Sequence, residues 1–404
     1  MPAAAAALQG LAIAAFLLQA SCALQFNTTG ANSVKFPDNP AEVLFTQIAT
    51  DLHRFTKTGI HIDMVEQPYC SEREPSFRVQ VLSGQVYIAG EVIDWHNTES
   101  RNRNVKLQLL DVAQHYRLPD ADFLLLTGDW PPEDRSGQST GCPLQGPVFM
   151  QTKKRRHDHV LLHPDHTFTD WNEANTPGWY QQQYLLAEAA RAVPWGEKIG
   201  KLFFAGNIDT GNRHIMRDVD LTKYPEFDIR VWNWKDHNSP MKFVKLPEHV
   251  KYKYLLNWPG NTYSARLKTL LLCNSTVVHS QIDGWVEFWY HTLEHGRNIV
   301  LTKGIEQTGD VTNKMHKVVK KLVQNEKTAM RIAAAGADLA QNVLSVENVR
   351  EYWYRLIVSY AKLQRFEVER HPDSVSLGES LTGPVIWRFE DRTCKVCSQT
   401  SFKR

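Results

Sequence analysis

Apolar and polar residues are arranged so that short buried strands and longer amphipathic helices follow one another along the chain. Short apolar runs, such as those at 121–127 and 202–204, have the composition of buried strands. Segments with apolar residues every third or fourth position, such as 314–324 and 346–365, predict amphipathic helices. This alternation in both halves of the chain favours parallel, doubly wound sheets, so we predict an α/β fold.

The chain has 404 residues, which is long for a single hydrophobic core and suits two domains. Alternating apolar residues on either side of Ser83 and Gly84 predict a β-hairpin, and a helix predicted at 180–193 marks the domain boundary. The expected organisation is an N-terminal segment at 1–23, a first domain at 40–185, a second domain at 186–345, a helix at 346–370 that packs back on the first domain, and a poorly ordered tail at 371–404.

The first 34 residues carry no charged side chain, and Ala3 to Ala23 is apolar. Ser21-Cys22-Ala23 has the small residues of a signal-peptide cleavage site, so we predict a secretory signal peptide cut near Ala23. An uncleaved signal anchor is the alternative, because the apolar run approaches the ~20 residues needed to span a bilayer. We therefore expect the protein in the lumen of the endoplasmic reticulum or Golgi, with membrane contact only if the anchor is retained.

The composition is typical of a soluble globular protein, with 42% apolar and 22% charged residues. A net charge of +2 gives no basis for a nucleic-acid partner. In an oxidising lumen, the nearby Cys394 and Cys397 predict a disulfide. Cys70 and Cys142 could form another pair, which their spacing does not decide, and Cys273 lies in an apolar run that predicts a buried thiol.

The segment 251–278 carries the strongest functional signal in the sequence. It predicts a strand, a break at Pro259-Gly260-Asn261, a helix capped by Ser264, and a second strand. Arg266 lies in the first turn of the predicted helix. Backbone N–H groups at a helix N-terminus, together with a guanidinium that can bind two oxygens, favour a diphosphate. An ordinary α/β unit with a surface arginine is the alternative that the spacing leaves open.

Two charged residues follow predicted strands in places where ligands bind. Asp129 lies just after the strand at 121–127, at the edge where open α/β sheets bind ligands, and a carboxylate there is a candidate general base. A simple turn residue before Trp130-Pro131-Pro132 is the alternative. Arg213 is predicted at a helix start, where a cation opposes the helix dipole, and this placement favours an anionic partner.

These segments resemble motifs of the protein O-glucosyltransferase family, glycosyltransferase family 90, which also includes the fungal capsule-associated xylosyltransferases. The resemblance runs from about 117 to about 360. It rests on KYKYL at 251–255 with Ser264, Arg266 and Lys268, R-L-P-D at 117–120, D-W-P at 129–131, F-A-G-N at 204–207 with Arg213, and W-V-E-F-W-Y at 285–290. Ala205 departs from the pattern, because many members carry Arg or Lys at that position.

The resemblance implies two Rossmann-like domains facing a cleft, the GT-B-type glycosyltransferase architecture. It also implies an inverting, metal-independent enzyme that transfers glucose or xylose from a UDP-sugar to a hydroxyl of a protein Ser/Thr or a glycan, with no cofactor beyond this donor substrate. Asp129 corresponds to the catalytic base of the family. UDP-sugar contacts are implied for Gly206, Asn207, Arg213, Thr262, Tyr263, Ser264, Arg266 and Glu287, with a structural ion pair as the alternative role of Glu287.

Two other functions fit parts of the sequence. A non-catalytic carbohydrate-binding protein on the same fold would explain the departure at Ala205. The joint presence of Asp129, Arg213 and Arg266 argues against it. A metal-dependent secreted hydrolase would use histidines and an aspartate that lie close in sequence, namely His157, Asp158, His159, His163 and His166. A polar loop edge explains that cluster more simply, and we expect no metal site.

Overall fold

The computed structural model describes residues 41–72, 74–93, 98–131, 146–171, 174–233, 244–281, 284–302, 311–383 and 392–393. The predicted signal segment lies outside this range. The helices are α2 Glu42–Leu52, α3 Ile62–Ser71, α4 Thr98–His115, α5 Trp179–Ala192, α6 Leu267–Leu272, α7 Val311–Gln324, α8 Glu326–Asp338, α9 Val346–Leu363 and α10 Leu377–Thr382. None of these described helices combines the length and apolarity needed to cross a bilayer.

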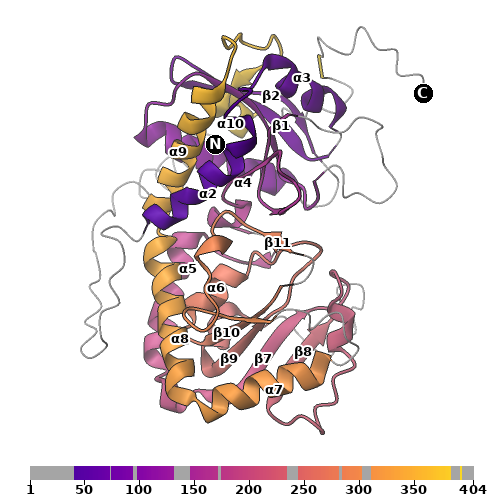
Figure 1. Ribbon diagram of the computed structural model, residues 1–404, viewed down its shortest axis with the longest axis vertical. Helices are drawn as coiled ribbons and strands as arrows, with labels where there is room; N and C mark the ends of the chain where they lie inside the picture. Colours follow the sequence, from indigo (N-terminus) through magenta and orange to yellow (C-terminus); the bar gives the residue numbers. More distant parts are fainter. Residues whose placement is uncertain are drawn as a thin grey trace, which may run out of the picture. The chain divides into compact units, whose positions relative to one another are not determined.

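The strands form two main sheets, which confirms the predicted α/β class (Figure 1). The strands are β1 Ser76–Leu82, β2 Gln85–Val92, β3 Ala121–Leu126, β4 Val148–Met150, β5 Lys153–Lys154, β6 Val160–Leu162, β7 Ile199–Asn207, β8 Phe227–Trp232, β9 Tyr252–Asn257, β10 Thr276–Ser280, β11 Trp285–Val286, β12 Val300–Thr302 and β13 Val375–Ser376. The first sheet has the order β13-β2-β1-β3-β4-β6 and the second has the order β12-β10-β9-β7-β8.

The second sheet is parallel throughout the described pairings, as predicted. Successive side chains of β9 enter different cores, because strand side chains alternate between faces. Tyr254 and Leu256 pack with Met315 of α7, whereas Leu255 belongs to the other cluster, which includes Leu271 of α6. Both faces are therefore covered by helices, which puts any ligand at the strand ends rather than on a sheet face.

The first sheet is mixed, so the prediction of a parallel sheet is wrong for this half. Strands β1 and β2 form the predicted hairpin, with positive φ at Ser83 (52°) and Gly84 (81°). A tight hairpin makes its two strands antiparallel, and β3 also pairs antiparallel with β1. Only β3, β4 and β6 run parallel to one another, and it is the carboxyl end of β3 that leads to Asp129.

Residues 371–383 are ordered, so the prediction of a poorly ordered tail is wrong for them. Strand β13 pairs with β2, and Leu377 of α10 is buried. The start of α10 carries a capping box in which the Ser376 and Glu379 side chains bond each other's backbone N–H groups. This S-x-x-E pattern is a known sequence signal for a helix start. Cys394 and Cys397 lie outside the described residues.

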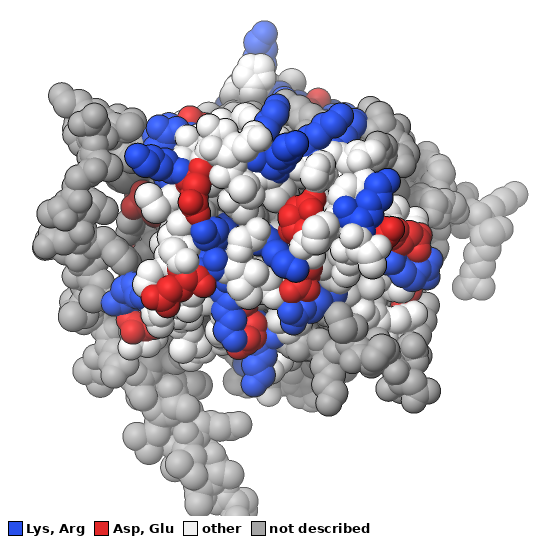
Figure 2. Space-filling view, turned by 90° about the horizontal axis from the view of Figure 1, so that it is seen from below, with Lys and Arg blue, Asp and Glu red and all other residues white. Residues whose placement is uncertain are grey.

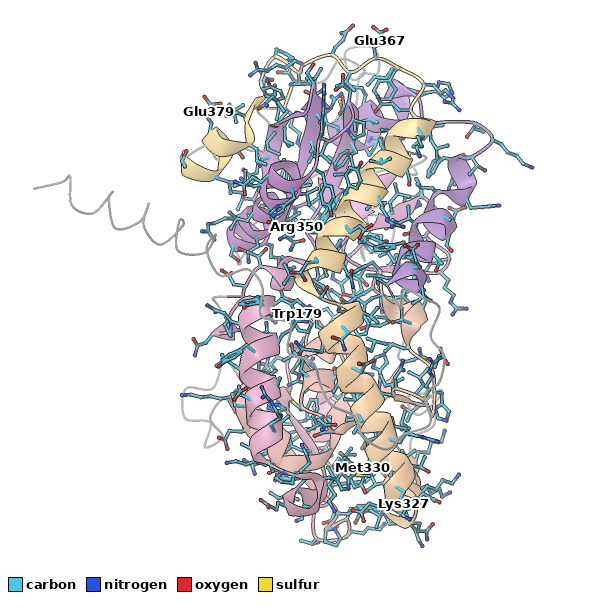
Figure 3. All side chains as sticks on the ribbon, turned by 90° about the vertical axis from the view of Figure 1, so that its left-hand side faces the viewer. Trp179, Lys327, Met330, Arg350, Glu367 and Glu379 are labelled. Carbon is cyan, nitrogen blue, oxygen red and sulfur yellow. The ribbon has the colours of Figure 1, made fainter. Side chains whose placement is uncertain are left out.

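Helix α9 packs on the first sheet and on α4. The Tyr360 hydroxyl donates to Asp122 O at 2.8 Å, and Arg350 Nε lies 2.6 Å from Asp111 Oδ2 of α4. At the other end, Trp179 of α5 donates its indole N–H to Leu344 O at 2.6 Å, between α8 and α9 (Figure 3). One hydrophobic cluster runs from the first sheet to the α5–α6 face of the second, so the described residues from 41 onward fall in one compact unit.

The surface seen from the α7 end carries both signs of charge. Lys and Arg side chains are interspersed with Asp and Glu on this face (Figure 2). Four lysines of α7, at 314, 317, 320 and 321, contribute positive charge. The described part of this face therefore has no continuous region of a single sign, in keeping with the net charge of +2.

Candidate active site

Asp129 lies directly after β3 and is held from two sides. Its Oδ1 accepts a hydrogen bond from Arg101 Nη1 of α4 at 2.8 Å, within an ion pair. Its Oδ2 accepts from Asn261 Nδ2, in the loop after β9, at 3.4 Å. The Asp129 side chain remains 26% exposed. The carboxylate is thus oriented by the protein and still open to a ligand, as a general base must be.

The loops that follow β7 and β9 pack tightly against each other. Gly211 N–H donates to Asn261 Oδ1 at 3.1 Å, so Asn261 contacts both the β7 loop and Asp129. Gly211 has a φ of +57°, and a Cβ atom there would lie 2.1 Å from Gly260 O. Only glycine fits at Gly211, for both conformational and steric reasons. This contact brings together the two segments that the sequence predicts to hold a diphosphate.

Arg213 and Arg266 come from these two segments. Arg213 donates from Nε to Pro259 O at 2.9 Å and from Nη2 to Trp258 O at 3.1 Å. Arg266 donates from Nη1 to Ala205 O, and its Cζ lies 5.5 Å from the ring centroid of Phe204. Arg266 binds the backbone oxygen of Ala205. Having alanine at this position, where many family members carry Arg or Lys, therefore does not remove this hydrogen bond.

The Arg213 and Arg266 side chains are half-buried and form a positive site without a counter-ion among the described residues. Burial lowers the pKa of Arg213 to about 9, with the nearby Arg266 charge as a further cause, and burial lowers the pKa of Arg266 to about 10. Arg266 Nε and Nη2 are buried and have no hydrogen-bond acceptor in the described part of the chain. Unpaired buried charge is costly, so this arrangement favours binding of an anion.

The predicted helix starts are wrong in detail. Helix α6 begins at Leu267 with Arg266 as its N-cap residue, and no side chain caps it, so Ser264 is buried in the preceding turn instead. Arg213 begins a 3₁₀ turn that ends at Met216. Elements this short have little macrodipole, because few peptide units are aligned. The preference for an anion therefore comes from the guanidinium groups.

The remaining predicted donor residues line the same loops. Gly206 and Asn207 end β7, and Asn207 Nδ2 donates to Thr210 Oγ1 at 3.1 Å. Thr262 and Tyr263 are buried in the β9 loop. Burial, then the Asp165, Glu287 and Asp129 carboxyl groups in that order, raise the pKa of Tyr263 well above its ordinary value. The Tyr263 phenol therefore lies within electrostatic reach of both Glu287 and Asp129.

Glu287 follows β11 and is buried, with an exposed fraction of 1%. Its Oε2 accepts from Trp289 Nε1 at 3.2 Å. No ion pair within 4.0 Å involves Glu287 in the part of the chain that the structure describes, although an ion pair is the alternative role predicted for it.

Arg101 and Asp165 belong to the site but carry no local signal in the sequence. Arg101 contacts Asp129 from a helix 28 positions earlier in the chain, and Asp165 reaches Lys268 across 103 positions. His166 lies beside Asp165 and is kept neutral, because burial and the Arg101 charge lower its pKa to about 3. The position of Asp165 after β6 could have indicated its place in the site, because β6 ends at the same sheet edge as β3, which precedes Asp129.

The side chains of the histidine segment have different surroundings. Asp158 is exposed and pairs with Arg54 at 2.6 Å, away from the buried His157 and His159 rings. His163 stacks on Trp353 at 4.9 Å between ring centroids, and burial lowers its pKa to about 4. Among the described residues, no group of three His, Cys, Asp or Glu side chains could hold a metal ion. The geometry gives no support to the metal-dependent hydrolase.

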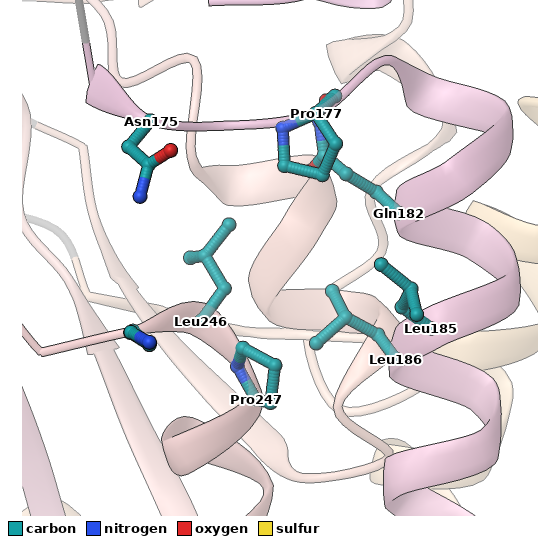
Figure 4. A pocket seen from close by; sticks show the side chains of 8 residues that line it. Asn175, Pro177, Gln182, Leu185, Leu186, Leu246 and Pro247 are labelled. Carbon is teal, nitrogen blue, oxygen red and sulfur yellow. The ribbon is translucent and has the colours of Figure 1, made fainter. Parts of the chain in front are cut away.

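A shallow pocket lies between α5 and the segment 244–247 (Figure 4). Its lining includes Leu185, Leu186 and Gln182 of α5, together with Leu246 and Pro247. The lining includes none of the predicted site residues. Gln182 is committed to hydrogen bonds with Pro177 O and Thr269, so the pocket offers little chemistry of its own.

Comparison with known proteins identifies the chain as a glycosyltransferase by family. Residues 39–401 match Glycosyl transferase family 90, and the chain therefore belongs to this family, which confirms the resemblance found in the sequence. O-glucosyltransferase rumi of Drosophila pseudoobscura pseudoobscura is 26% identical over 336 residues, which cover 80% of this chain and 78% of that protein. Protein O-glucosyltransferase 1 of Mus musculus is 27% identical over 289 residues, with coverages of 68% and 70%.

Among solved structures, the crystal structure of Anabaena Alr3699/HepE in complex with UDP-glucose is similar at 13% sequence identity. The similarity covers 45% of each chain with a TM-score of 0.28. A match this low carries no argument about fold or ligand.

Proposed function

We propose that this protein is an inverting, metal-independent glycosyltransferase that moves glucose or xylose from a UDP-sugar to a hydroxyl of a protein Ser/Thr or a glycan. The observation that carries the proposal is the half-buried pair Arg213 and Arg266, which has no protein counter-ion among the described residues. Asp129 approaches the same loops through Asn261. The proposed architecture is of the GT-B type, with an acceptor domain at 40–185 and a donor domain at 186–345.

The proposed reaction breaks one bond and forms one. The acceptor oxygen attacks the anomeric carbon on the face opposite the diphosphate, the bond from that carbon to the phosphate oxygen breaks, and UDP leaves. Asp129 takes the proton of the acceptor hydroxyl as the new bond forms. Arg213 and Arg266 stabilise the negative charge that develops on the leaving diphosphate. A single displacement inverts the configuration and needs no covalent enzyme intermediate.

The names of the related proteins, which describe O-glucosyltransferases, support glucose as the transferred sugar. Xylose lacks only the hydroxymethyl group of glucose and stays within the proposal. We propose the lumen of the endoplasmic reticulum or Golgi as the location. Cys70 is disulfide-bonded to a partner outside the described residues, and a disulfide supports an oxidising compartment.

The proposal is tested by measuring UDP release from a panel of UDP-sugars, with EDTA present and with hydroxyl acceptors of both classes. Release from UDP-glucose or UDP-xylose in EDTA is the expected result. Tight UDP binding without release from any donor and acceptor pair would favour the non-catalytic carbohydrate-binding protein. Release that appears only after a divalent ion is added would overturn the metal-independent mechanism.

Replacing Arg101 by Met is expected to lower kcat on the order of 10- to 100-fold, with UDP affinity unchanged. Arg101 Nη1 fixes Asp129 Oδ1 at 2.8 Å and also reaches Thr127 O at 3.3 Å, so its loss lets the base leave its productive orientation. Arg103→Met is the matched control, because Arg103 is exposed on the same helix. An equal loss of activity in both variants, or a loss of UDP binding in Arg101→Met, would contradict this role.

A further inference from the structure

Three buried side chains from distant segments meet behind the β9 loop. Asp165 precedes the 3₁₀ turn His166–Phe168 that follows β6, Lys268 lies in α6, and Glu287 follows β11. Strand β11 pairs with β5, so the Glu287 segment is joined to the half of the chain that carries Asp129. The cluster therefore connects the Arg266 segment to the Asp129 half of the protein.

Asp165 is fully supplied with partners for an ionised carboxylate. Lys268 Nζ lies 2.9 Å from its Oδ2 and 3.2 Å from its Oδ1, and the Thr167 N–H and hydroxyl donate to Oδ1 at 2.7 and 2.6 Å. Burial opposes ionisation, but these partners, Lys268 first, hold the pKa of Asp165 at about 2. Asp165 therefore stays ionised, and the Lys268 ammonium group is the main partner that stabilises its negative charge.

Glu287 has weaker support, which comes from neutral donors. Its Oε2 accepts from the Trp289 indole N–H at 3.2 Å, and the Tyr290 hydroxyl lies within hydrogen-bonding reach of the Glu287 carboxyl group. Asp165 lies within hydrogen-bonding reach of the Glu287 carboxyl group. A carboxylate cannot donate a hydrogen bond, and two adjacent buried carboxyl groups that share one lysine cannot both be ionised. The contact is favourable only if one of the two holds a proton.

We propose that Glu287 is a neutral carboxylic acid that donates its proton to the Asp165 carboxylate, and that this proton-sharing pair is a positioning element of the donor site. The inference rests on the proposed function, because the site it positions is the one assigned to the UDP-sugar. Lys268 transmits the effect, since its Nζ also donates to Ala265 O at 3.1 Å, next to Arg266. The proposed role of Glu287 is therefore exerted through Lys268 and Arg266.

The charges facing Glu287 explain why the proton matters. Asp165 and Lys268 balance each other, and the Tyr263 and Tyr290 phenols are neutral, with pKa values that burial and neighbouring carboxyl groups raise well above the ordinary range. With Glu287 neutral the cluster has no net charge. Ionisation of Glu287 would add an uncompensated negative charge close to a site that binds a diphosphate.

The pair also predicts how stability depends on pH. Burial and the Asp165 carboxylate raise the pKa of Glu287 well above its ordinary value. Above the unfolded-state pKa, at about 4.3, the unfolded chain has lost this proton while the folded chain still holds it. Folding then becomes about tenfold less favourable for each unit of rising pH, until the pH reaches the folded-state pKa. A glutamine at 287 removes this dependence.

The test compares Glu287→Gln with Glu287→Ala. The amide of glutamine can donate to Asp165 in place of the acid proton, so UDP affinity and kcat are expected to stay within about threefold of wild type, and alanine is expected to lose at least tenfold in UDP affinity. In denaturant unfolding between pH 5 and pH 8, the glutamine variant is expected to gain stability relative to wild type as pH rises. Glu367→Gln, at an exposed glutamate, is the control and should show a flat difference.

An ionised Glu287 would give the opposite pattern and overturn the proposal. The glutamine variant would then lose UDP affinity as alanine does, and its stability difference from wild type would be flat or would fall as pH rises. The unfolding measurement requires no turnover, so it tests the proton-sharing pair separately from the proposed function. Wild-type protein that fails to bind UDP would refute the proposed function and, with it, the positioning role.

Discussion

Replacing Asp129 by Asn is expected to lower sugar transfer by a factor on the order of 10² to 10⁴, the usual contribution of a general base. The amide is nearly the same size as the carboxylate but cannot take a proton from the acceptor hydroxyl. The amide oxygen of this variant can still accept from Arg101, so the loop geometry should survive. UDP affinity is expected to change by less than about threefold, because the diphosphate is assigned to Arg213 and Arg266. Initial transfer rates and titration calorimetry with UDP measure the two effects.

The control for this variant is Asp158→Asn. Asp158 is an exposed aspartate in the same half of the chain, paired with Arg54 and remote from the strand end that carries Asp129. Its replacement should leave transfer unchanged. Transfer at the wild-type rate in Asp129→Asn would remove Asp129 from the mechanism.

Replacing Arg266 by Met is expected to weaken UDP binding by about 10- to 100-fold. Hydrogen bonds to charged groups contribute about 1.5–3 kcal/mol, and about 1.4 kcal/mol corresponds to tenfold in affinity. The same change should leave the thermal stability of the ligand-free protein unchanged or raise it, because it removes a buried charge that lacks a counter-ion. Thermal unfolding with and without UDP measures both effects on one sample.

Arg217→Met serves as the matched control, because Arg217 is exposed and pairs with the exposed Asp218. It should change neither UDP affinity nor stability. In the double variant of Arg213 and Arg266, the losses of affinity should be non-additive, since both arginines are assigned to the same diphosphate. UDP affinity that is unchanged in Arg266→Met would show that the diphosphate binds elsewhere.

The parts of the site that could be predicted from the sequence are those at strand ends. Asp129 follows β3, Asn207 ends β7, and Pro259 follows β9, and each strand is a short apolar run broken by turn residues. Strands β7 and β9 are parallel neighbours in the second sheet, so their carboxyl ends share one edge, where open α/β sheets bind ligands. Asp129 lies at the corresponding edge of the first sheet, after β3. The hairpin at Ser83 makes the first sheet mixed, but β3, β4 and β6 still run parallel to one another.

Long-range contacts and short turns could not be predicted. The ion pair of Arg101 with Asp129 and that of Lys268 with Asp165 depend on how α4 and α6 pack, which no local pattern encodes. The helix expected to be capped by Ser264 has Arg266 as its N-cap residue, two positions later, and the Arg266 side chain is held against Ala205 O and the Phe204 ring. Tertiary packing overrides the local capping preference here.

The central claim is most directly tested by the stereochemistry of the transferred sugar. Proton NMR of the product formed from UDP-α-glucose or UDP-α-xylose in EDTA shows the anomeric configuration of the new bond. A single displacement assisted by Asp129 predicts a β-linked product from the α-linked donor, formed without a divalent ion. An α-linked product would require a different mechanism and would contradict the account.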